Sequence, residues 1–118
     1  MSAGYRLTHL GGAQVLLEPS EALDASQPEQ QMGEIYTYLL DHHAQRLIFD
    51  AQPMPLIDTT LYSWLDHLGR ICHLADTELV VVRMRPEAAF ALARHITADP
   101  PFVCEANVER ARQRSLPH

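Results

Sequence analysis

Three hydroxyl groups lie close together at one predicted helix start, in the segment Asp58-Thr59-Thr60 and at Ser63. Asp58 is typical of an N-cap, because its carboxylate can accept a hydrogen bond from an N–H group of the first turn. Backbone N–H groups of a first turn have no acceptor inside the helix, and the helix dipole is positive there. A phosphate placed on a hydroxyl of that first turn would meet those donors. On local sequence alone, a plain helix cap with polar neighbours remains the preferred interpretation.

Metal chemistry is the next hypothesis, because the chain has 7 histidines. His42 and His43 are adjacent, so on a helix their side chains point in different directions and suit one ion poorly. His67 and His73 also lack the spacing of metal ligands. We therefore expect no metal and no cofactor.

No nucleophile–base pair and no glycine-rich phosphate loop is found, so no catalytic activity is predicted. Cys72 and Cys104 are far apart and form no CxxC pair, and we expect both to be buried apolar residues. A net charge of −6 and a pI near 5.5 argue against a nucleic-acid binder.

The chain has 118 residues, which fits a single domain over 1–118. No apolar run is long enough to span a bilayer. The first residues lack the apolar block of a secretory signal, so we expect a cytoplasmic protein.

The first half of the chain predicts a hairpin, a helix and a strand. Gly11-Gly12 between two short apolar runs is typical of a tight turn. Ser26 is expected to cap a helix with Pro28 in its first turn. Its apolar stripe is expected to comprise Met32, Ile35, Tyr36, Leu39, Leu40 and His43. Arg46 to Asp50 then suits a buried strand.

The second half predicts alternating helices and strands. After the helix that follows Asp58 comes Glu78 to Val82, the clearest strand of the chain. A third helix begins near Pro86, followed by a strand over 102–104 and a last helix capped by Asn107. The residues of the third helix expected to face inward are Ala89, Phe90, Ala93 and Ile96. The order ββαβαβαβα predicts an α/β fold with a mostly parallel sheet and an antiparallel hairpin at its edge.

Three motifs in this order resemble the STAS family of anti-sigma-factor antagonists and stressosome proteins. Ile48-Phe49-Asp50 followed by Met54 to Thr59 resembles the family's strand, loop and Asp-Ser or Asp-Thr helix start. Glu21-Ala22-Leu23-Asp24 looks like its Gly-Glu-Leu-Asp, and Arg85-Pro86-Glu87 looks like the Arg-Pro-Glu of stressosome members. The resemblance covers nearly the whole chain and implies a short, single-domain STAS protein.

The resemblance implies a signalling module without enzymatic activity, switched by phosphorylation of Thr59, with Thr60 and Ser63 as alternatives. Asp58 and Asp24 would lie near the hydroxyl, orient it for a kinase and repel the phosphate. Bulky residues after Thr60 shift the likeness towards stressosome scaffolds. Val82-Arg83-Met84 replaces the second phosphorylatable position of some scaffolds, so a second switch is not expected.

The partners implied are a Ser/Thr kinase of the anti-sigma type, other STAS-domain proteins, further copies of this chain and, as an additional candidate, a phosphatase. Tyr62, Arg83 and Arg85 are candidate partner-binding residues. The two arginines could form an anion-facing patch, but surface ion pairs with Glu87 and Asp76 are the favoured interpretation.

Three other interpretations compete with a phosphorylation switch. A phosphoacceptor receiver domain needs a lysine, and all nine basic residues of this chain are arginine. A STAS module could bind a small anion or a lipid without being phosphorylated, since fold does not fix function. A STAS domain could also act only as a scaffold.

Overall fold

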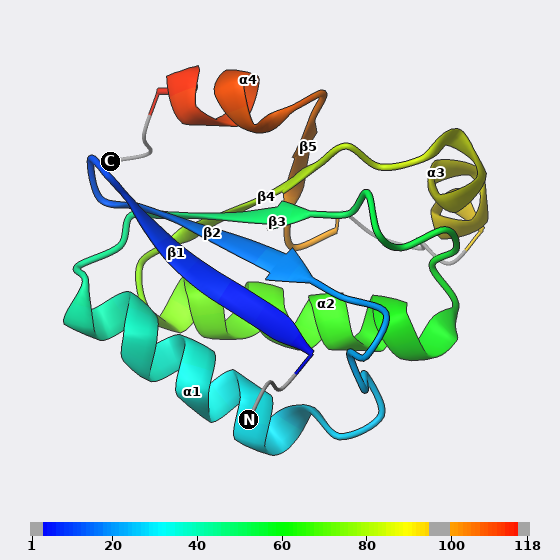
Figure 1. Ribbon diagram of the computed structural model, residues 1–118, viewed down its shortest axis with the longest axis horizontal. Coiled ribbons are helices and arrows are strands. Elements are labelled where there is room, and N and C mark those ends of the chain that lie inside the picture. Colours follow the sequence, from blue (N-terminus) through cyan, green and yellow to red (C-terminus); the bar gives the residue numbers. More distant parts are fainter. Residues whose placement is uncertain (1–3, 95–99, 116–118) are drawn as a thin grey trace.

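The computed structural model describes residues 4–94 and 100–115. A 5-stranded sheet in the order β1-β2-β3-β4-β5 forms its centre (Figure 1). Strands β1 and β2 are antiparallel, and the other neighbouring pairs are parallel. The strands are β1 Tyr5–Gly11, β2 Gln14–Pro19, β3 Arg46–Asp50, β4 Glu78–Val82 and β5 Val103–Glu105.

In the described part of the chain, four helices accompany this sheet: α1 Pro28–Asp41, α2 Thr59–Leu74, α3 Pro86–Ala93 and α4 Val108–Gln113. The element order and the α/β class predicted from the sequence are confirmed, with the hairpin as the antiparallel edge. Within residues 4–94 and 100–115, no helix combines the length and apolar character needed to cross a bilayer.

The sheet is covered on both faces by different helices. Helices α1 and α2 lie on one face and α4 lies on the other (Figure 1). Leu79 and Val81 of β4 join the large cluster that contains the α1 and α2 residues, whereas Val80 and Val82 join a small cluster with Ala111 of α4. The uninterrupted apolar run of β4 therefore reflects burial on both faces.

Helix α1 differs from the prediction at its start and in its stripe. Its N-cap is Gln27, without a side-chain bond, because Ser26 instead donates to Asp24. Leu40 is 46% exposed and His43 is also exposed, so both predicted stripe positions are wrong. The confirmed inward residues are Met32, Ile35 and Leu39, joined by Gln31.

The predicted inward face of α3 is also wrong. Ala88 and Leu92 are buried, whereas Ala89, Phe90 and Ala93 are exposed; the side chain of Phe90 is among the most exposed apolar groups. Ile96 lies outside the described residues. The apolar composition of this helix left its orientation undetermined, because an almost uniformly apolar segment has no distinct periodic face.

The two cysteines have different environments. Cys72 is buried, and burial raises its pKa to about 12. Cys104 is exposed, which corrects the expectation that both cysteines are buried, although partial burial and Glu105 raise its pKa. The final strand begins at Val103 rather than at Phe102, whose side chain is buried just before it.

A buried arginine fixes α4 to the sheet. Arg46, fully buried at the start of β3, donates from Nε to Glu78 at 2.8 Å and from its Nη2 atom to the carbonyl of Ser115 at 3.2 Å. Arg114 contacts Glu78 at 3.1 Å and Glu105 at 2.9 Å. The chain end is therefore held by charge-assisted hydrogen bonds, which are stronger than neutral ones.

Two helical glycines are expected to respond in opposite ways to alanine. A methyl group on Gly69 would lie 2.6 Å from Cβ of Pro101, whereas nothing lies within 4 Å of one on Gly33. Gly33→Ala should stabilise the fold by about 0.5–1 kcal/mol through helix propensity. Gly69→Ala should destabilise it by about 1–3 kcal/mol through overpacking. Urea unfolding of both variants measures the difference, and equal effects would contradict this packing.

Candidate functional site

Backbone hydrogen bonds and buried side chains hold the loop between β3 and α2 against the rest of the protein. The N–H of Ala51 donates to the carbonyl of Val82 at 2.9 Å, which continues the sheet by one residue. The N–H of Met54 donates to the carbonyl of Ala51 at 2.9 Å. The side chains of Met54 and Ile57 are both buried. Met54 and Ile57 thus anchor the segment that leads to Asp58.

Asp58 caps α2 as predicted. Its Oδ1 atom accepts from the N–H of Leu61 at 2.8 Å, and its carbonyl accepts from the N–H of Tyr62 at 2.9 Å. The N–H groups of Thr59 and Thr60 lie in the first turn of α2, where backbone N–H groups have no acceptor within the helix. Thr59, Thr60 and Ser63 are all exposed. The helix start therefore presents three accessible hydroxyls beside unpaired backbone donors.

Two surface hollows meet at this helix start. One, of about 330 Å3, is lined by Asp24, Asp58 and Thr60 among others. The second, of about 460 Å3, is lined by Thr59, Thr60 and Ser63. The structure thus brings Asp24 and Asp58 together with Thr60, while Thr59 lies in the adjoining hollow.

The carboxylate of Asp24 is held by its own loop. Its Oδ1 atom accepts from the N–H of Ser26 at 3.1 Å and from the Ser26 hydroxyl at 2.6 Å. These hydrogen bonds lower the pKa of Asp24, so this group is negative at neutral pH. The rim of the first hollow accordingly carries a fixed negative charge.

Gln31 connects the Asp24 loop to α2, a role that the sequence analysis missed. Its Oε1 atom accepts from the indole N–H of Trp64 at 2.8 Å, and its Nε2 atom donates to the carbonyl of Asp24 at 3.2 Å. Gln31 is 8% exposed and Trp64 is fully buried. A polar residue inside an apolar helical stripe, opposite a buried tryptophan, was the available signal.

Arg83 and Arg85 lie after β4, and neither lines the two hollows. Arg83 makes a two-bond ion pair with Asp50, one bond being 3.1 Å from Nε to Oδ1, and this pairing raises its pKa. The Nε atom of Arg85 donates to the carbonyl of Gln52 at 2.9 Å. The predicted pairing with Glu87 and Asp76 is therefore wrong, because the arginines face the end of β3.

Arg83 also adopts a left-handed backbone conformation, with φ of 57°. This conformation is uncommon for a residue other than glycine and is held here by the ion pair to Asp50. Neither feature follows from the local pattern, because the two residues are 33 positions apart.

The remaining candidates have limited exposure or no suitable geometry. Tyr62 is half-buried and packs against the large core cluster. His67 contacts the carbonyl of Ser63 at 2.7 Å through Nδ1. Among the described residues, no three His, Cys, Asp or Glu side chains gather so that they could hold a metal ion.

No protein-family model matches the sequence, and no curated protein matches it. Solved structures do. A variant of RsbS from Moorella thermoacetica, with glutamate in place of a serine, is 15% identical with a TM-score of 0.78, over 90% of this chain and 91% of that chain. A chain from the stressosome, a signal integration and transduction hub, is 14% identical with a TM-score of 0.76, over 88% of this chain and 90% of that chain.

The unphosphorylated anti-sigma factor antagonist SpoIIAA gives 13% identity and a TM-score of 0.62, over 92% of this chain and 94% of that chain. This chain has the STAS fold. The resemblance inferred from three short motifs is thus confirmed at the level of the fold.

Removing the Asp58 cap should loosen the start of α2. Asp58→Ala is expected to lower the free energy of unfolding by about 1 kcal/mol, because the N–H of Leu61 loses its acceptor. Asp58→Asn keeps an acceptor oxygen and should cost only a few tenths of that amount. Chemical denaturation, with hydrogen exchange at Leu61, distinguishes the two variants. An alanine variant as stable as the asparagine variant would argue against the cap.

The Gln31–Trp64 bond is testable by a double-mutant cycle. Gln31→Met should destabilise the fold by about 1–3 kcal/mol, because the Trp64 N–H would be buried without an acceptor. Adding Trp64→Phe removes that donor, so the double variant should lose less than the sum of the single losses. Additive losses in urea titrations would show that the two side chains are not coupled.

Proposed function

We propose that this STAS chain is a non-enzymatic signalling module, acting as an anti-sigma-factor antagonist or stressosome-type scaffold, in which phosphorylation at the start of α2 switches partner binding. The observation that carries the proposal is the capped helix start, where Asp58 leaves three hydroxyls exposed beside backbone donors. The likeness to an anti-sigma factor antagonist and to stressosome proteins supports it.

A phosphate on Thr59 could be held without a cluster of cations. The N–H groups of the first turn and the positive end of the helix dipole favour an anion there. Arg83 is already paired with Asp50, so it is not a free counter-charge. The added charge of nearly −2 would therefore alter the surface of the domain more than its fold.

The family resemblance assigns the switch to Thr59, and the geometry makes Thr60 the principal alternative. Thr60 lines the same hollow as Asp24 and Asp58, where a phosphate would meet two carboxylates. Like charges in one hollow would keep the modified and unmodified surfaces energetically distinct. Ser63 lies one turn further along the helix.

The proposed partners follow from this switch. They are a Ser/Thr kinase of the anti-sigma type, other STAS-domain proteins including further copies of this chain, and a phosphatase that would reverse the modification. A second candidate function is the binding of a small anion or a lipid headgroup without phosphorylation, favoured by the two hollows of about 330 and 460 Å3 at the helix start.

Thr59→Asp should release a partner that wild type and Thr59→Ala retain. The aspartate mimics part of the phosphate charge, and at the first helical position it is expected to stabilise the helix by about 0.3–1 kcal/mol. Loss of binding would thus not come from unfolding. Affinity capture from native cytosol, with partners and phosphosites read by mass spectrometry, measures both properties.

Matched variants assign the acceptor and the class of function. Thr60→Asp and Ser63→Asp add the same charge nearby, and Ala106→Asp adds it at an exposed site before α4. Identical partners for every variant, with no phosphate on Thr59, Thr60 or Ser63, would contradict the switch. Binding of a small anion by the unmodified protein under those conditions would support the second candidate.

A further inference from the structure

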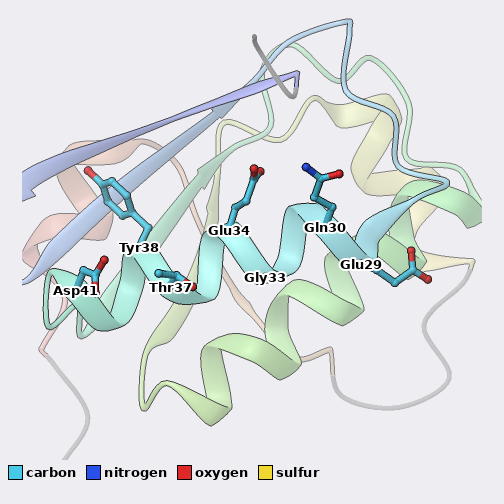
Figure 2. Close-up of a pocket in the computed structure, with 7 residues that line it drawn as sticks. All are labelled: Glu29, Gln30, Gly33, Glu34, Thr37, Tyr38 and Asp41. Carbon is cyan, nitrogen blue, oxygen red and sulfur yellow. The ribbon is translucent and has the colours of Figure 1, made fainter.

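The outer face of α1 forms a shallow groove of about 640 Å3, separate from the hollows described above except at Glu29. Figure 2 shows its lining spread along the helix, with Glu29 near one end, Asp41 at the other and Gly33 between them. Gly33 leaves the middle of the groove open, because nothing lies within 4 Å of the position that a Cβ atom would occupy there. Another helix could therefore approach the backbone closely here.

The charge of this groove has one sign. Glu29, Glu34 and Asp41 line it, and no residue of α1 is basic. One oxygen of Glu34 accepts from the Tyr5 hydroxyl at 2.7 Å, which leaves the carboxylates of Glu29 and Asp41 as the more available charges.

Two residues of the groove reduce the stability of their own helix. Gly33 lies mid-helix, where glycine costs about 1 kcal/mol relative to alanine. Asp41 is the last residue of α1, where the helix dipole is negative and no basic residue compensates it. Local rules are broken mainly where function requires it, and both exceptions face the same groove.

The opposite face of the molecule carries the complementary charge. Helix α4 lies across the sheet from α1 (Figure 1), and its Arg110 and Arg112 are exposed. The Nη2 atom of Arg112 donates to the carbonyl of Leu10 at 3.3 Å, whereas the guanidinium of Arg114 is paired with Glu78 and Glu105. Arg110 and Arg112 thus remain available, with Glu109 as the acidic residue of this helix.

We propose that the acidic α1 groove of one copy receives Arg110 and Arg112 of α4 from a second copy. Because the two surfaces lie on opposite faces of the sheet, the contact is head-to-tail, and repetition gives a ring or an open chain. The inference rests on the association of like chains put forward above and does not require phosphorylation at the start of α2.

Two complementary charge changes test the contact in purified, unmodified protein. One variant, Glu29→Arg with Asp41→Arg, leaves Glu34 as the remaining acid of the lining and makes the groove net basic. The other variant, Arg110→Glu with Arg112→Glu, makes α4 acidic. Each alone should weaken self-association at least about tenfold, because ion pairs are replaced by like charges. Mixing the two should restore it, since basic groove then meets acidic α4. Sedimentation velocity over a concentration series reads the association.

Controls separate the contact from folding and from net charge. Arg6→Glu with Arg70→Glu changes two arginines that are 75% exposed and lie outside α1 and α4, and association should persist. Gly33→Ala and Asp41→Asn should raise the midpoint of unfolding yet weaken association. A monomeric wild type at the highest soluble concentration, or a mixture that fails to reassociate, would overturn the proposal. A failed phospho-switch would leave these results unchanged.

Discussion

Gln31 is the residue on which the arrangement of the candidate site depends. Through one amide it accepts from Trp64 of α2 and donates to the carbonyl of Asp24, so it joins the switch helix, α1 and the loop after β2. The bond to Trp64 is buried and the bond to Asp24 is partly buried, and a buried hydrogen bond left unmade costs more than a made one contributes. Gln31 therefore ties the Asp24 loop to the helix that carries the hydroxyls.

The sequence predicts structural elements correctly where the pattern that indicates them is local and strong. The run Glu78 to Val82 and the cap Asp58 both lie where predicted, because β-branched residues and N-cap chemistry act over a few positions. The pairing of Arg83 with Asp50 was not predictable in this way. It depends on β3 and β4 being neighbours in register, with Asp50 opposite Val82, and on a left-handed turn at Arg83.

The helix faces show a similar limit. In α2 the polar residues leave one apolar stripe, and its larger residues Leu61, Trp64, Leu65, Leu68 and Cys72 are buried. In α3 nearly every residue is apolar, so periodicity could not decide between Phe90 and Ala88, and the small residue is the buried one. The buried face of α3 thus holds the small Ala88, and the side chain of Phe90 remains 69% exposed.

The buried charge of Arg46 gives α4 its place. A helix of 6 residues is too short to be stable by itself, and an unpaired guanidinium in the interior would cost several kcal/mol. Because Arg46 donates to Glu78 and to the carbonyl groups of Arg112 and Ser115, α4 and the sheet stabilise each other. This anchoring holds Arg110 and Arg112 on a rigid face.

Glu29 links the proposed switch to the proposed contact between copies. It lines the hollow that contains Thr59 and also the groove on α1. A phosphate on Thr59 would add negative charge at the end of that groove, and within a Debye length of about 10 Å such a charge is only partly screened. Phosphorylation would thus repel an acidic partner at the helix start while strengthening the field that attracts an arginine of a neighbouring copy. The same modification would act with opposite sign on the two kinds of association.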